Sequence, residues 1–178
     1  DLGAVDVPVY GTLTPEQVAY QAADSGAVAA VVETPEQMSK LLAVRDRCPD
    51  LRHLIQVEGA AESGVLAFDE VSGSAGGGSE ERFWDRAAEV DEHDLMTLIY
   101  TSGTTGDPKG VMLTHHNLVQ NVLHSAHRVP VQRSDLALEF LPLCHVLERM
   151  VGYIYMWRGT SKAYCSVYHV GDLLAEIR

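Results

Sequence analysis

The tetrapeptide Thr-Pro-Glu-Gln occurs twice near the beginning of the chain, at 14–17 and at 34–37. Each copy follows an apolar segment rich in β-branched residues, at 5–10 and at 27–32. A threonine hydroxyl, a proline one residue later and a glutamine three residues later are typical of a helix start with a capping box. We therefore expect two strands, each leading into a helix.

The helix ends can also be predicted. Gly26 is expected to end the first helix and Cys48-Pro49 the second, and a further strand is expected at 54–57. Alternation of strands and helices is typical of βαβ units. We expect an α/β fold with mainly parallel sheets flanked by helices. A solenoid repeat is a weaker interpretation, because shared capping chemistry explains four matching residues.

The chain divides at a polar segment. We expect a βα-repeat portion at 1–70, a flexible Gly/Ser-rich linker at 71–81, and a third portion at 82–178. The elements expected in the third portion are helices at 81–90, 115–127 (capped by Thr114) and 145–157 (ended by Gly159), and strands at 95–100, 111–113, 136–143 and 160–166.

The connection between the strands at 95–100 and 111–113 carries the chemistry. It holds hydroxyls at Thr101, Ser102, Thr104 and Thr105, glycines at Gly103, Gly106 and Gly110, and the cation Lys109. Glycines let backbone N–H groups approach an anion, hydroxyls add donors, and Pro108 stiffens the turn before the lysine. We expect a polyphosphate as the ligand. The common phosphate loop is excluded, because counting from Gly103 places Pro108 at its second glycine.

Residues 100–110 read Tyr-Thr-Ser-Gly-Thr-Thr-Gly-Asp-Pro-Lys-Gly, which closely resembles the signature of the adenylate-forming superfamily. The stretch at 141–153, with Pro142, His145 and Arg149, resembles a second motif of that superfamily and its long-chain acyl-CoA synthetase branch in particular. Some relatives carry an aromatic gate where this chain has Arg149. The resemblance covers nearly the whole chain.

The resemblance implies an ATP-dependent long-chain fatty acid–CoA ligase, with CoA as co-substrate. Thr101 would help hold Mg²⁺ together with a glutamate outside this chain, and Lys109 would neutralise the departing pyrophosphate. Ser102, Gly103, Thr104, Thr105 and Gly106 would wrap the ATP phosphates. His145 would lie near the adenylate and the acyl group.

Several superfamily segments are missing, namely Gly-Tyr-Gly-x-Thr-Glu, Tyr-x-x-Gly-Asp and the C-terminal Gly-Lys. The chain begins with aspartate and ends within an expected helix at 171–178. We therefore expect an internal fragment of an N-terminal domain, inactive when isolated. A fatty acyl-AMP ligase or a peptide-synthetase adenylation domain stays open as an alternative. So does a non-catalytic phosphate-binding or interaction module.

Other residues offer weaker hypotheses. A metal site at His124 and His127 lacks further ligands in the nearby sequence. A thiol nucleophile at Cys144 beside His145 rests on adjacency alone, which is not spatial pairing. The aromatic and methionine side chains at 150–157 fit either an acyl tunnel or ordinary core packing.

Composition narrows the partners. The formal net charge of −12 argues against nucleic acid, which is bound through clustered Lys and Arg. Three cysteines without a Cys-x-x-Cys pair are typical of a reducing compartment. The sequence has no apolar run long enough to span a bilayer. We expect a cytoplasmic location, and peripheral membrane contact stays open for the intact protein.

Overall fold

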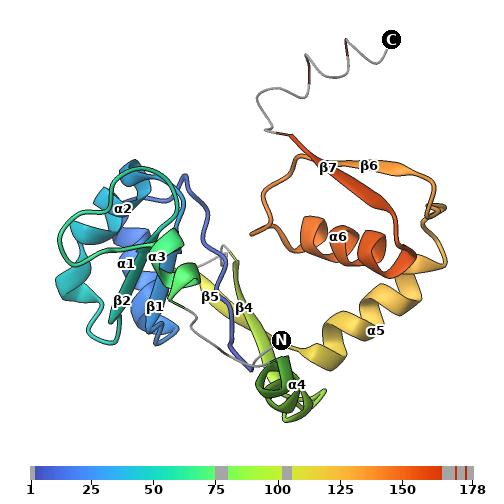
Figure 1. Ribbon diagram of the computed structural model, residues 1–178, viewed down its shortest axis with the longest axis horizontal. Coiled ribbons are helices and arrows are strands. Elements are labelled where there is room, and N and C mark those ends of the chain that lie inside the picture. The colour runs from blue at the N-terminus through green and yellow to red at the C-terminus, as the bar shows by residue number, and fades with distance from the viewer. Residues whose placement is uncertain (1–2, 75–79, 102–105, 166–170, 172–174, 176–178) are drawn as a thin grey trace. The chain divides into compact units, whose positions relative to one another are not determined.

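The computed structural model describes residues 3–74, 80–101, 106–165, 171 and 175. These residues form two compact units, which are taken separately below. Unit 1 comprises Asp1–Asp91 and Met96–Met112, and unit 2 comprises Glu92–Leu95 and Leu113–Arg178. Figure 1 shows the elements of both units.

Unit 1 contains a three-stranded sheet of β1 (Ala29–Val32), β2 (His53–Gln56) and β3 (Leu66–Ala67), in that order. Both pairings are parallel, with Ala30 opposite Leu54 and Ile55 opposite Leu66. The chain passes from β1 to β2 through α2 (Pro35–Leu42) and the short helix η1 (Arg45–Arg47). This is the predicted βαβ unit, and the α/β class with parallel sheets is confirmed.

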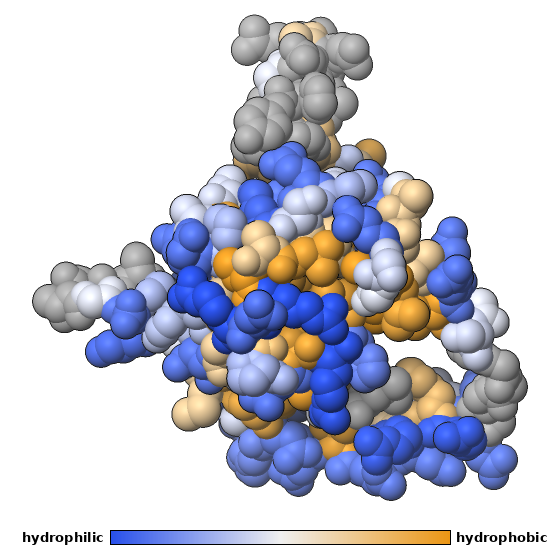
Figure 2. Space-filling view, turned by 90° about the vertical axis from the view of Figure 1, so that its left-hand side faces the viewer, coloured by the Kyte–Doolittle hydropathy of each residue, from blue (hydrophilic) through white to orange (hydrophobic). Residues whose placement is uncertain are grey.

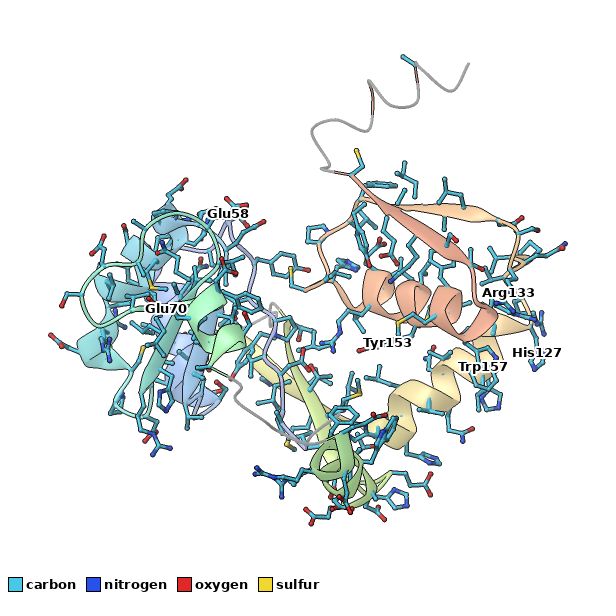
Figure 3. All side chains as sticks on the ribbon, viewed as in Figure 1. Glu58, Glu70, His127, Arg133, Tyr153 and Trp157 are labelled. Carbon is cyan, nitrogen blue, oxygen red and sulfur yellow. The ribbon has the colours of Figure 1, made fainter. Side chains whose placement is uncertain are left out.

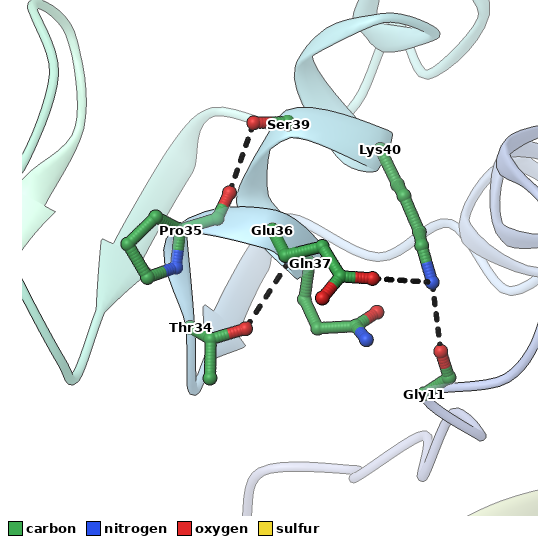
Figure 4. Close-up of polar contacts among 7 residues, drawn as sticks. All are labelled: Gly11, Thr34, Pro35, Glu36, Gln37, Ser39 and Lys40. Carbon is green, nitrogen blue, oxygen red and sulfur yellow. Dashed lines mark hydrogen bonds and ion pairs between the residues drawn. The ribbon is translucent and has the colours of Figure 1, made fainter.

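The two Thr-Pro-Glu-Gln segments do begin helices. Thr14 caps α1 (Pro15–Asp24) with both halves of a capping box, and Gly26 follows this helix with a φ of 64°. At α2 the structure shows one half of a capping box, in which the Gln37 N–H donates to the Thr34 hydroxyl at 3.4 Å. Figure 4 shows this contact.

Lys40, on α2, ties that helix to the segment before α1. Its ammonium group donates to the Gly11 carbonyl at 2.9 Å and lies 4.0 Å from the Glu36 carboxylate (Figure 4). Helix α2 ends at Leu42, earlier than the predicted end at Cys48-Pro49. The short helix η1 lies between these two positions.

The core of unit 1 lies between the helices and one face of the sheet. Its buried side chains are Ala19, Met38, Leu41, Val44, Cys48, Leu51, Leu54 and Val65. On the opposite face, Val31, Ile55 and Leu66 share one register row, and both Val31 and Leu66 are exposed. Surface apolar side chains appear as orange areas in Figure 2.

The predicted strand at 5–10 is wrong over most of its length. Only Asp6 forms a bridge, parallel to Thr97 of β4 (Leu95–Thr101). The Thr97 hydroxyl also donates to the Asp6 carbonyl at 3.0 Å. A strand needs ladder hydrogen bonds along its length, and Pro8 has no N–H to donate.

The segment predicted as a linker begins as a helix, because α3 spans Phe68–Gly73. Residues 75–79 lie outside the described residues. Helix α4 (Glu80–Ala88) agrees with the helix expected at 81–90.

Unit 2 contains a parallel pair, β6 (Leu136–Glu139) and β7 (Ser161–Tyr164), with α5 (His115–Ala126) and α6 (Val146–Arg158). Thr114 and Asn117 form a capping box at α5, and Gly159 ends α6 with a φ of 71°. Val122, Ala126 and the fully buried Ile154 form the core. Strand β6 is shorter than the expected 136–143, and the helix expected at 171–178 falls mainly outside the described residues.

Candidate phosphate-binding site

Two neighbouring strands carry predicted phosphate ligands at the ends that their connection joins. Strand β4 ends at Thr101, β5 (Lys109–Thr114) begins at Lys109, and the two strands are hydrogen-bonded neighbours. Thr101 and Lys109 are both exposed. The predicted ligands Ser102, Gly103, Thr104 and Thr105 lie outside the described residues.

Gly106 has a backbone conformation that requires glycine. Its φ is 112°, and a Cβ built there would meet no heavy atom within 4 Å. Open space with left-handed geometry is what a backbone needs to approach a ligand closely. The predicted part of Gly106 in phosphate binding stays a prediction with this geometry in its favour.

Gly110 has a packing reason to be glycine, and its predicted approach to an anion stays a prediction. A Cβ at Gly110 would lie 3.2 Å from Cζ and 3.4 Å from the hydroxyl oxygen of Tyr100. Glycine therefore lets β5 pass close to the Tyr100 ring, which stands on β4. This is a packing requirement, and a motif pattern alone does not reveal it.

Helix α1 contacts both ends of the strand connection. The Tyr100 hydroxyl donates to the Asp24 carboxylate at 2.6 Å, and the Tyr20 hydroxyl donates to the Pro108 carbonyl at 3.0 Å. The Tyr20 and Tyr100 rings meet edge to face, with centroids 6.3 Å apart. Burial, followed by the hydrogen bond to Asp24, raises the pKa of Tyr100 well above its ordinary value. Tyr100 is therefore a neutral donor throughout the physiological range.

Sequence reasoning did not identify Tyr20 or Asp24. Both lie far from the loop in sequence, and tyrosine on a helix is common. One signal was available, because Asp24 is a carboxylate in the last turn of α1, where the helix dipole disfavours negative charge.

Lys109 is available to a ligand. Among residues 3–74, 80–101 and 106–165, none forms an ion pair with it, and the residue is exposed. An exposed cation, a terminal hydroxyl at Thr101 and a glycine with positive φ together suit an anionic, oxygen-rich ligand.

His145 belongs to unit 2. It is exposed and caps α6, with the Leu147 N–H donating to its Nδ1 at 3.3 Å. With Nδ1 accepting, the neutral ring carries its proton on Nε2, which leaves that N–H to serve as a donor. This capping contact was not predicted. The proposed place of His145 beside the acyl group stays a prediction.

A buried charge cluster lies between α6 and the β6–β7 pair of unit 2. The Lys162 ammonium lies 3.3 Å from the Glu139 carboxylate, whose side chain is 2% exposed. Glu148 is also buried, and it accepts a hydrogen bond from the Leu141 backbone N–H. Burial, followed by the nearby Glu139 charge, raises the pKa of Glu148. Glu148 thus ties α6 to the segment that leads into His145.

The structure adds no support to a metal site at His124 and His127 or to a thiol nucleophile at Cys144. Within the described part of the chain, no group of three or more His, Cys, Asp or Glu side chains is arranged to hold a metal ion. His124 Nδ1 instead lies 2.6 Å from the Gln120 carbonyl of the same helix. Cys144 is half-buried, and the His145 ring beside it caps the helix.

The side chains at 150–157, the candidates for an acyl tunnel, fall into a packed group and an exposed group. Met150 and Tyr153 pack around the buried Ile154, as ordinary core residues do. Met156 and Trp157 are exposed, and Trp157 is labelled in Figure 3. Arg149, which stands where some relatives have an aromatic gate, donates to the Tyr153 hydroxyl at 3.2 Å.

No helix among the described residues is both long and apolar enough to cross a membrane.

The fold defines an α/β protein built from parallel strand pairs and covering helices. A family model described as AMP-binding enzyme matches residues 1–170, and the chain belongs to this family. It is 37% identical over 152 residues to the long-chain-fatty-acid–CoA ligase FadD15 of Mycobacterium bovis. The aligned region covers 84% of this chain and 25% of the relative.

Two further proteins are similar. The chain is 32% identical over 187 residues to the long-chain-fatty-acid–[acyl-carrier-protein] ligase AEE15 of Arabidopsis thaliana, covering 96% of this chain and 25% of the relative. The crystal structure of a long-chain-fatty-acid–CoA ligase, FadD1, from Archaeoglobus fulgidus matches with a TM-score of 0.74 and 27% identity, over 96% of this chain and 32% of that one. The chain spans about a quarter of the length of the two curated relatives.

Proposed function

We propose that this chain is the phosphate-binding part of an AMP-forming long-chain fatty acid–CoA ligase. Such an enzyme lets a fatty acid carboxylate attack the α-phosphorus of ATP, which releases pyrophosphate, and the CoA thiol then displaces AMP from the acyl-adenylate. The observation that carries the proposal is the exposed Lys109 at the start of β5, which forms no ion pair with any residue that the structure describes, while Thr101 ends the neighbouring strand β4. Similarity to long-chain fatty acid ligases supports the substrate class.

Lys109 acts on the phosphates in this scheme. Its ammonium offsets the negative charge that develops on the departing pyrophosphate. Removing one such donor from a preorganised site costs about 10²–10³ in rate. Gly106 and the residues at 102–105 supply backbone N–H groups and hydroxyls to the same phosphates.

Thr101 offers one oxygen to Mg²⁺, which prefers six oxygen ligands and usually takes most of them from water and phosphate. A single hydroxyl beside a phosphate site fits such a partly bound ion. The ion would supply charge neutralisation there. The remaining protein ligand would be a glutamate outside this chain.

We assign His145 to the acyl side of the reaction. Because its Nδ1 is occupied by the Leu147 N–H, its Nε2–H can donate to a carboxylate or adenylate oxygen. We also propose a cytoplasmic location, which agrees with the absence of any disulfide among Cys48, Cys144 and Cys165.

The test is Lys109→Ala in the intact protein, with Lys40→Ala as the matched control. Lys40 is the other lysine of unit 1, and it contacts Gly11 and Glu36. We expect fatty-acid-dependent ATP–pyrophosphate exchange to fall about 10²-fold or more in Lys109→Ala, with fatty acid affinity nearly unchanged. Equal exchange rates in the wild type and Lys109→Ala would remove this lysine from the mechanism.

The acceptor needs its own assay, because one relative is named as an acyl-carrier-protein ligase. We expect the wild-type enzyme to form acyl-CoA from CoA. Acyl transfer to an acyl carrier protein with none to CoA would identify the alternative acceptor. Absence of any pyrophosphate exchange by the wild-type protein would favour a non-catalytic phosphate-binding module.

A further inference from the structure

Helix α1 presents two polar side chains one turn apart, and each contacts one end of the strand connection that carries Thr101 and Lys109. Asp24 accepts from the Tyr100 hydroxyl at 2.6 Å, and Tyr20 donates to the Pro108 carbonyl at 3.0 Å. Tyr100 directly precedes Thr101, and Pro108 directly precedes Lys109. Each candidate phosphate ligand therefore has a neighbour held by the same helix.

The spacing on α1 sets the spacing of these contacts. Residues four apart on a helix lie on one face, with their Cβ atoms about 5–6 Å apart. Because one rigid helix supplies both side chains, the ends of the connection are held relative to each other as well as to α1. The edge-to-face contact of the Tyr20 and Tyr100 rings adds a third restraint.

The chemistry of the contacts suits a positioning role. The short hydrogen bond from Tyr100 to a carboxylate is charge-assisted, the stronger class of hydrogen bond. The raised pKa of Tyr100 keeps its hydroxyl protonated as the donor. Gly110 adds to the arrangement, because a Cβ there would lie 3.2 Å from Cζ of Tyr100 and would require a small shift of the ring or of β5.

We propose that Tyr20 and Asp24 are positioning residues that set the placement of Thr101 and Lys109 against the nucleotide phosphates. This inference rests on the proposed function, because it assumes that these two residues bind phosphate. Neither Tyr20 nor Asp24 touches the phosphates in this scheme. Electrostatic catalysis depends on donors placed before the reaction begins, so loosening their supports lowers the rate without removing a ligand.

The experiment uses Tyr20→Phe and Asp24→Asn in the intact protein. The first keeps the ring and removes the donor to Pro108, and the second keeps an acceptor oxygen and removes its charge. Asp50→Asn, at an exposed position of the same unit, is the matched control. We expect the double variant to raise the KM for ATP about tenfold and to lower kcat of pyrophosphate exchange by a similar factor.

The KM for fatty acid should stay within about twofold of the wild-type value, because this substrate does not contact the phosphate ligands. A general loss of folded protein would lower kcat alone and leave both KM values unchanged. An unchanged KM for ATP in the double variant would therefore overturn the proposal.

Amide hydrogen exchange gives a readout that does not depend on activity. In the double variant we expect exchange to become about tenfold faster at Thr101 and Lys109 and to stay unchanged at Ile55 of β2. Unchanged exchange at all three amides would overturn the positioning role. The wild-type protein could instead lack ATP–pyrophosphate exchange activity while the double variant shows the expected increase in amide hydrogen exchange. That outcome would refute the proposed function alone.

Discussion

Lys162→Met removes the cation that faces two buried carboxylates in unit 2. The Lys162 ammonium lies 3.3 Å from Glu139, and Glu148 approaches from α6. At an effective dielectric constant of about 20, two unit charges 3.3 Å apart attract by about 5 kcal/mol. Breaking a buried pair by removing one partner typically costs about 3–5 kcal/mol, because the other charge stays buried without compensation. We expect a loss in the free energy of unfolding in this range near neutral pH.

The loss should depend on pH, and the cause is Glu148. Its pKa is raised above the ordinary 4.5, so at a pH between the unfolded-state and folded-state pKa values the folded state holds a proton that the unfolded state has released. Its contribution to stability is present below pH 4.5 and is lost as the pH rises through the folded-state pKa. The titratable groups that face it are Glu139 on β6, Lys162 on β7 and His145 at the start of α6.

Without the lysine, ionising Glu148 beside Glu139 becomes more costly. We therefore expect the penalty of Lys162→Met to be smaller near pH 4.5, the ordinary pKa from which that of Glu148 is raised, than at about pH 8. Urea unfolding at both pH values, followed by circular dichroism, measures the difference.

Two further variants make the test specific. Lys40→Met removes an ammonium that lies 4.0 Å from Glu36, whose side chain is 81% exposed, and that donates to the Gly11 carbonyl, and it should cost about 1 kcal/mol because both contacts are exposed. Adding Glu139→Gln to Lys162→Met should restore part of the lost stability, because the uncompensated charge is then gone. A penalty below about 1 kcal/mol for Lys162→Met, or one equal at both pH values, would refute the reasoning.

Two other substitutions test local structure. Thr14→Ala removes the hydroxyl that accepts from the Gln17 N–H, which is one half of the α1 capping box, and should cost about 1 kcal/mol in urea unfolding; no change would mean that this contact is not formed in solution. Gly106→Ala forces a side chain into a φ of 112° at a cost of about 1–3 kcal/mol, and should raise the KM for ATP but not for fatty acid. Gly73→Ala, at a position with open space and no positive φ, is its control and should be neutral or stabilising. Equal ATP KM values for both glycine variants would show that the backbone at Gly106 is unimportant.

Features set by neighbouring residues could be predicted from the sequence. Thr14, Thr34 and Thr114 cap helices because their hydroxyls reach backbone N–H groups three residues away. Gly26 and Gly159 follow helices because they adopt positive φ there. The same local logic failed at 5–10, where β-branched residues suggested a strand but pairing is limited to Asp6.

Features set by distant residues could not be predicted. Lys162 was interpreted only as part of a strand, and its partner Glu139 stands on a different strand of the same pair. Gly110 fits the phosphate motif by position, yet its nearest neighbours are the ring atoms of Tyr100. Each depends on which strands become neighbours, and a local pattern does not contain that information.

Asp24 shows how a local conflict can mark such a long-range contact. A carboxylate at the C-terminal end of a helix faces the negative end of the helix dipole, which costs roughly 0.5 kcal/mol at an exposed site. A hydrogen bond to a charged group returns roughly 1.5 kcal/mol, so the contact with Tyr100 outweighs the dipole. The same position without Tyr100 would favour a neutral or basic residue. Asp24 is therefore better explained by the strand it holds, next to Thr101, than by the helix in which it lies.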